Sequence, residues 1–146
     1  FCSSRKYPNF IKMDIEGHEV SVFESGYEYF KENDGETHIL LEVHPHFYNQ
    51  DNDFVAILKK YFEIGFRCSY VVSTPIPQPE LFSKKGYSPE KIVNTDGFNR
   101  GIYRNVKDED IIEIACKENI QAWRGGVSKK IARSIMLSRE KGVKNG

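Results

Sequence analysis

The sequence predicts an α/β fold, and three observations point to it. Residues 10–15 form a short apolar run with the density of a buried parallel strand. After Gly17 the apolar residues change to helical spacing, at Val20, Phe23, Tyr27 and Phe30. A second buried run follows at residues 38–43. Strand, glycine turn, helix and strand in this order are typical of an α/β unit.

The elements that follow have recognisable ends. The helix after Gly17 is expected to end near Lys31, before the turn signal at residues 33–35, and Pro45 stops the second strand. Residues 54–62 carry an apolar stripe at helical spacing, and Gly65 ends that helix. Residues 66–73 then read as a third strand, rich in residues that favour strands.

The rest of the chain changes in character. Residues 74–100 hold most of the prolines and show no sustained periodicity, so we expect an irregular insertion there. Residues 101–106 resemble a fourth strand, and Asp108 can cap a helix. Ser128 is expected to cap a last helix, whose basic face could dock an anionic partner or simply face solvent.

Composition limits the class of protein. The 146 residues have a formal net charge of zero, which gives no general attraction to nucleic acid or to an anionic membrane. Three cysteines without a paired spacing favour a reducing compartment, so we expect a cytoplasmic protein. No apolar run approaches the ~18 residues that a membrane span needs, and no signal peptide is visible.

Polar side chains follow both buried strands. Asp14 and Glu16 stand two residues apart at the end of the first strand, and Glu42 and His44 repeat this spacing on the second. If the strands are neighbours, about 4.8 Å apart, the four groups meet at one rim, where general-base chemistry is possible. The alternative is that the acidic residues cap the following helices and face water.

Other residues near this rim have two interpretations each. Gly17 serves a tight turn, and its missing side chain would also let a ligand approach the backbone. His18 could contact a substrate or only begin the helix. His44 and His46 with the nearby carboxylates could form a metal site, but their spacing is a weak signal, and we expect no metal.

These residues carry a resemblance to a known family. The segments Ile11-Lys12-Met13-Asp14-Ile15-Glu16-Gly17-His18-Glu19 and Ile39-Leu40-Leu41-Glu42-Val43-His44-Pro45 resemble the fourth and fifth strands of FkbM-type S-adenosylmethionine-dependent methyltransferases. The resemblance covers residues 10–48 strongly and extends in layout to about residue 107.

The resemblance implies a fold and its division. It implies a Rossmann-like class I methyltransferase fold, of which residues 1–107 would be the C-terminal half, strands four to seven, with residues 74–100 as an irregular insertion. Beyond residue 107 the family pattern ends, and capping residues and helical spacing predict that residues 108–146 form a helical C-terminal extension. No G-x-G-x-G loop occurs in the sequence, so we expect a fragment that lacks most of the cofactor site.

The resemblance also assigns roles, with S-adenosylmethionine as the cofactor. It places Asp14, Glu16 and Gly17 beside the cofactor, and the fifth-strand residues on the acceptor side. A base must take the acceptor's hydroxyl proton, and His44, Asp14 and Glu42 are the candidates. We favour His44, because imidazole changes protonation state near neutral pH.

The acceptor would be a small molecule, a sugar or a glycan. His18, His46 and Tyr87 are the candidate acceptor-binding residues. Tyr87 belongs to the proline-rich segment, which could form a lid over a hydroxylated acceptor.

Two other functions remain open at this stage. A non-catalytic half-domain could act as a protein-interaction module, or self-associate, through the free edge of its first strand. A metal-dependent hydrolase could use the cluster of aspartate, glutamate and histidine. The coding region upstream of Phe1 would separate the methyltransferase from the interaction module, because the former needs a glycine-rich turn there.

Overall fold

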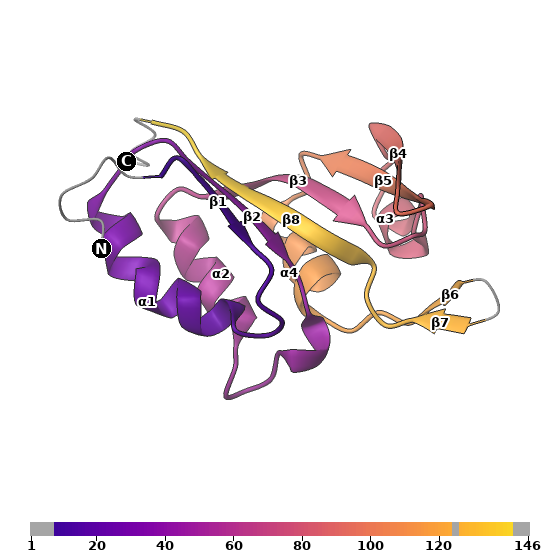
Figure 1. The fold of residues 1–146 in the computed structure, drawn as a ribbon, viewed down its shortest axis with the longest axis horizontal. Helices are drawn as coiled ribbons and strands as arrows, with labels where there is room; N and C mark the ends of the chain where they lie inside the picture. The colour runs from indigo at the N-terminus through magenta and orange to yellow at the C-terminus, as the bar shows by residue number, and fades with distance from the viewer. Residues whose placement is uncertain (1–7, 124–125, 142–146) are drawn as a thin grey trace.

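The computed structural model describes residues 8–123 and 126–141, and it confirms a mixed α/β architecture. A six-stranded sheet has helices packed against it (Figure 1). In chain order the elements are β1 (Phe10–Met13), α1 (Glu19–Glu32), β2 (Thr37–Glu42), the 3₁₀ turn η1 (Pro45–Phe47), α2 (Phe54–Glu63), β3 (Arg67–Ser73), α3 (Glu80–Lys84), β4 (Lys91–Thr95), β5 (Phe98–Arg104), α4 (Asp108–Cys116), β6 (Gln121–Trp123), β7 (Gly126–Ser128) and β8 (Ala132–Arg139).

The sheet order is β1-β2-β8-β3-β5-β4. β1 and β2 are parallel, and β8 runs antiparallel between β2 and β3. The strands β1, β2 and β3 therefore point the same way, and their carboxyl ends share one rim with the start of β8. β5 and β4 complete the far side as an antiparallel hairpin. Mixed sheets of this kind are common among large sheets in α/β proteins.

The helices α1, α2 and α4 lie side by side on one face of the sheet (Figure 1). Apolar residues that alternate along the strands, such as Ile39 and Leu41, are buried against them. Aromatic rings join the first two helices: the Phe23 and Tyr61 ring centroids are 4.6 Å apart, and the Tyr61 hydroxyl donates to the Phe23 carbonyl. The opposite face carries residues such as Leu40 and Glu42, which are only partly buried.

The C-terminal segment corrects one prediction. Residues 128–136 do not form a helix: they lie in β7, a connection and β8, so the described part of residues 108–146 contains no helix after α4. The apolar residues there fit helical spacing, but Ile135, Leu137 and Arg139 also alternate with half-buried residues. Pairing with β2 on one side and β3 on the other decides in favour of the strand, because tertiary context overrides local pattern.

A second correction concerns residues 74–100. The segment contains helix α3, strand β4 and the start of β5, so it is not an irregular insertion throughout. Its prolines interrupt the apolar periodicity, so the sequence pattern did not predict the short elements α3 and β4. The expected edge of the first strand is confirmed: within the described residues, β1 ends the sheet and pairs only with β2. None of the described helices is long and apolar enough to cross a membrane.

Candidate functional site

The turn between β1 and α1 is built around Gly17. Glu16 and Gly17 both have positive φ, +46° and +94°, which reverses the chain sharply. The Gly17 N–H donates to the Glu19 carboxylate (3.2 Å), and its carbonyl accepts from the Asn52 amide (3.2 Å). A Cβ on Gly17 would lie 2.6 Å from the ring of Phe47. The space beside this glycine is therefore filled by Phe47, and the assignment of Gly17 to the cofactor site gains no support from the structure.

Replacing Gly17 with alanine should destabilise the protein by about 2–3 kcal/mol. The variant combines a left-handed backbone, which costs ~1–2 kcal/mol for a residue with a Cβ, with displacement of Phe47. Urea unfolding of Gly17→Ala measures the sum. Gly86→Ala is the matched control, since Gly86 also has positive φ but has nothing near its Cβ position. Equal losses in both variants would show that Phe47 contributes nothing.

A buried pair follows this turn. Glu19, in the first turn of α1, is fully buried, and one of its oxygens lies 2.7 Å from Nδ1 of His44. The same oxygen, Oε1, accepts from the Gly17 N–H. With a carboxylate on Nδ1, a neutral imidazole carries its hydrogen there and presents a free lone pair at Nε2. Within the described residues Nε2 of His44 makes no hydrogen bond, and the side chain is 10% exposed.

The second oxygen of Glu19, Oε2, is buried and has no hydrogen-bond partner among the described residues. A buried polar atom without a partner costs ~1–3 kcal/mol of folding free energy. Fold stability alone therefore does not explain why Oε2 of Glu19 is buried. A buried ionisable side chain next to a second one, such as Glu19 next to His44, recurs at functional sites.

Glu42 has a different environment from His44. Its two oxygens lie 3.1 Å from the Lys130 ammonium and 3.4 Å from Nε of Arg133. Burial acts to raise the pKa of Glu42, but the hydrogen bond and charge of Lys130, together with Arg133, outweigh it, and the pKa lies below its ordinary value. A carboxylate held by two cations is a poor proton acceptor, which favours His44 over Glu42 as the base.

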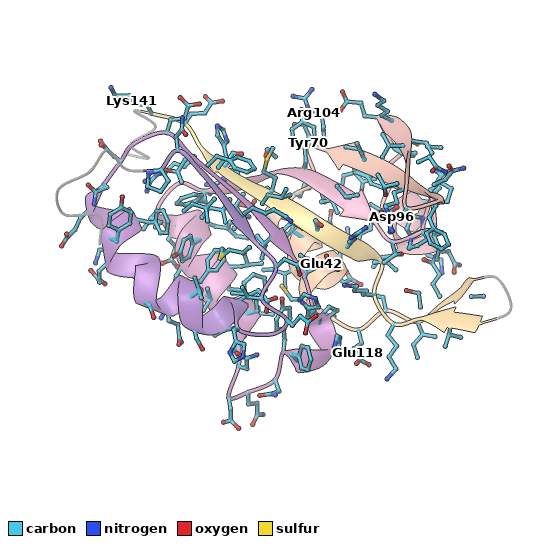
Figure 2. The ribbon with its side chains drawn as sticks, in the orientation of Figure 1. Glu42, Tyr70, Asp96, Arg104, Glu118 and Lys141 are labelled. Carbon is cyan, nitrogen blue, oxygen red and sulfur yellow. The ribbon has the colours of Figure 1, made fainter. Side chains whose placement is uncertain are left out.

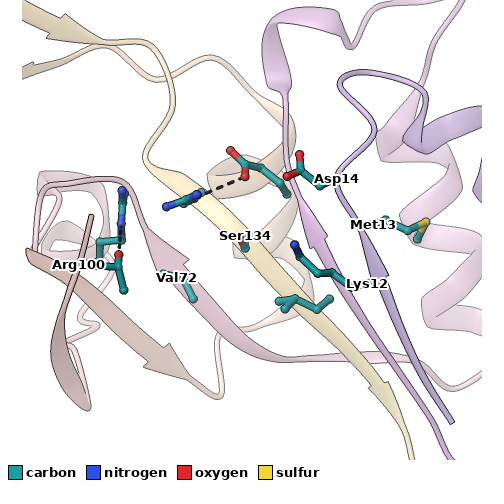
Figure 3. A pocket seen from close by; sticks show the side chains of 10 residues that line it. Lys12, Met13, Asp14, Val72, Arg100 and Ser134 are labelled. Carbon is teal, nitrogen blue, oxygen red and sulfur yellow. Dashed lines mark hydrogen bonds and ion pairs between the residues drawn. The ribbon is translucent and has the colours of Figure 1, made fainter. Parts of the chain in front are cut away.

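Asp14 and Glu42 line the same pocket on the open face of the sheet (Figure 3). Its volume is about 220 Å³. The polar side chains around it come from five strands and the turns beside them: Lys12, Asp14, Glu42, Thr95, Arg100 and Arg133. The structure thus brings two of the three candidate bases into one pocket, and it places the third, His44, against α1.

The other predicted site residues are more scattered. Glu16 and His18 are exposed in the turn before α1, and His46 is exposed in η1, its ring centroid 6.1 Å from that of His44. Tyr87 donates its hydroxyl hydrogen to Asp110 of α4 (2.6 Å) and does not line the pocket. Its role in acceptor binding stays a prediction.

The metal site finds no support. Across residues 8–123 and 126–141, no group of three or more histidine, cysteine, aspartate or glutamate side chains is arranged to hold a metal ion. The hydrolase alternative depended on such a group, because water activation needs a bound metal there.

Sequence reasoning missed four residues of the site. Glu19 was not among the candidates, since nothing in the spacing shows that it is buried. Arg100 lay in the supposed insertion, and Lys130 and Arg133 in the supposed basic helix. Only the position of β8 beside β2 shows that the last two neutralise Glu42.

These features define an α/β protein with a charged site at the carboxyl ends of its parallel strands, where open α/β sheets bind ligands. Residues 4–68 match the model of the methyltransferase FkbM domain, which confirms the resemblance over that part of the chain. The match includes Asp14, Glu19, Glu42 and His44. No curated protein and no solved structure gives a match.

Proposed function

We propose that this chain forms the C-terminal half of a Rossmann-like methyltransferase domain that methylates a hydroxyl oxygen of a small molecule, a sugar or a glycan. The observation that carries the proposal is the buried Glu19–His44 pair inside the matched segment. The parallel strands β1, β2 and β3, connected through helices on one face, support the Rossmann-like part of the proposal.

The donor in this proposal is S-adenosylmethionine, which supplies an electrophilic methyl group when bound. Asp14 and Glu16 fit it in one respect: both carboxylates are exposed at the end of β1 and have no partner among the described residues, so they can accept hydrogen bonds from hydroxyl or ammonium groups. The backbone groups of Gly17 are already used by Glu19 and Asn52.

His44 would act as the base. Nε2 would take the proton of the acceptor hydroxyl, and the imidazolium that forms would be stabilised by the Glu19 carboxylate at Nδ1. Glu19 is thus a positioning residue, which fixes the tautomer and direction of the ring. In methyl transfer, aligning the acceptor oxygen with the methyl group contributes more to the rate than the base does. The residues at the rim of the sheet would supply this alignment.

Release of S-adenosylhomocysteine tests the proposal. The chain, and the product of any reading frame that extends it upstream, are incubated with S-adenosylmethionine and a panel of hydroxylated acceptors, sugars among them. We expect acceptor-dependent release that requires His44. If a protein that binds the donor tightly releases no S-adenosylhomocysteine with any hydroxylated acceptor, O-methyl transfer is the wrong reaction.

An interaction module is the second candidate, because β1 leaves one edge of the sheet open among the described residues. An exposed strand edge is a template for pairing with another chain. Sedimentation velocity over a concentration series distinguishes the two ideas: self-association that disappears when Phe10, whose backbone N–H points away from β2, is replaced by proline supports edge pairing. A monomer at all concentrations argues against it.

A further inference from the structure

The pocket on the open face contains a cation with few partners. The side chain of Arg100 is 8% exposed, and its Nε–H donates to Thr95 Oγ1 (2.7 Å). The only carboxylate that the described residues bring to its terminal nitrogens is Asp96, at 4.0 Å, the outer limit of an ion pair. A guanidinium has five N–H donors, so most of those on Arg100 have no protein partner.

Asp96 does not neutralise Arg100. Its carboxylate is 70% exposed and lies closer to Arg133, at 3.2 Å. Arg133 in turn is shared between Asp96 and Glu42. Glu42 and Asp96 are therefore matched to Lys130 and Arg133, and Arg100 has only the distant Asp96 carboxylate and the Phe98 ring, 6.0 Å from its guanidinium, as partners for its charge.

The Arg100 guanidinium is partly desolvated and has no carboxylate within ordinary hydrogen-bond distance. Burial lowers the pKa of Arg100, and the neighbouring charge of Arg133 lowers it further, against the opposing effect of Asp96 and Glu42. Two parallel N–H donors of a guanidinium fit a carboxylate, sulfate or phosphate group, and a bound anion would offset the cost of this desolvation. Lys12, which also lines the pocket, adds a second positive charge.

The other side of the pocket carries a negative charge, from Asp14. Figure 3 shows Asp14 and Arg100 at opposite sides, with β8 and β3 between them. The Asp14 carboxylate is exposed and has no partner among the described residues, so it can accept hydrogen bonds from hydroxyl groups. A cavity of ~150 Å³ holds a benzene-sized ring, so about 220 Å³ admits one substituted six-membered ring.

We propose that this pocket binds a sugar that carries an oxyanion, with the anionic group on Arg100 and a hydroxyl on Asp14. If the sugar is the methyl acceptor, this inference rests on the proposed function. The binding itself does not, and it is measured without any methyl donor.

Titration of the ¹⁵N-labelled chain with D-glucuronate, D-glucose 6-phosphate and D-glucose tests the proposal. We expect saturable shifts of the Thr95, Arg100 and Ser134 amide signals with at least one of the two anionic sugars, and at least tenfold weaker binding of glucose. The tighter of the two anions identifies carboxylate or phosphate as the group recognised. Equal binding of glucose, or no saturable shift with either anion, overturns the proposal.

Variants locate the anion. Arg100→Gln should weaken binding of the anionic sugar at least tenfold, and Arg100→Lys, which keeps the charge but loses the paired donors, should weaken it less. Arg104→Gln is the matched control: this arginine follows Arg100 on the same strand but lies beside Tyr70, outside the pocket (Figure 2). Unchanged affinity in Arg100→Lys and in Asp14→Asn would reject the site even if Arg100→Gln fails to fold.

These measurements separate the two proposals. Sugar binding that depends on Arg100, in a protein that transfers no methyl group, would leave the pocket standing and remove the reaction. Methyl transfer to neutral acceptors that is unaffected by Arg100→Lys would support the reaction and reject the sugar pocket.

Discussion

Replacing His44 with glutamine should lower kcat for methyl transfer by about 10²- to 10⁴-fold, the usual contribution of a positioned general base. Glutamine keeps much of the size and polarity of the histidine, so the fold should survive. In the proposed reaction His44 acts on the proton rather than on binding, so KM for the acceptor should change little. The rate of S-adenosylhomocysteine release at saturating acceptor measures the effect.

Two further variants make this result specific. Glu19→Gln should lower kcat about tenfold or more, since it removes the charge that orients and stabilises the imidazolium while His44 remains. His38→Gln is the control: its ring is bonded to Ser138 and Glu36, away from the Glu19–His44 pair. Normal turnover in His44→Gln, or a comparable fall in His38→Gln, would remove His44 from the reaction.

The core of the fold could be predicted from local pattern. Apolar runs mark the parallel strands β1, β2 and β3, helical spacing or a capping residue marks the helices α1, α2 and α4, and turn residues such as Gly17, Pro45 and Gly65 mark element ends. β8 could not be predicted this way. Its residues satisfy both periods, and the choice depends on β2 and β3, which lie about 65 to 100 residues away in the chain.

The same limit applies to the site. Spacing predicted that Asp14, Glu16, Glu42 and His44 meet at one rim. Of these, Asp14 and Glu42 line one pocket, because both follow strands that are neighbours. Spacing could not show that His44 turns toward Glu19, or that β8 brings Lys130 and Arg133 to Glu42. Contacts between segments far apart in the chain decide which carboxylate is free and which is matched. In this protein these contacts leave Nε2 of His44 and the carboxylate of Asp14 without a hydrogen-bond partner among the described residues.

Arg139, the last residue of β8, makes the second large prediction. Its residue exposure is 5%, and its guanidinium donates to the Phe30 carbonyl (2.6 Å), to the Ile64 carbonyl (3.4 Å) and to Asn33. These carbonyls close the C-terminal ends of α1 and α2, where helices leave carbonyl groups without partners. The buried side chain of Arg139 therefore links the ends of α1 and α2 to strand β8.

Arg139→Met should lower the free energy of unfolding by about 3–5 kcal/mol, measured by urea denaturation. Methionine fills much of the volume but leaves the partly buried carbonyls without these donors, and the contact of the guanidinium with the Phe66 ring, 4.7 Å from its centroid, is also lost. Arg104→Met is the control, because Arg104 is half exposed and pairs with Glu90 at the surface, where such pairs contribute ~0–1 kcal/mol. Losses of the same size in both variants would mean that Arg139 acts as a surface charge. A loss confined to Arg139→Met would show that the C-terminal strand, which local pattern assigned to a helix, holds the helical layer next to the candidate site in place.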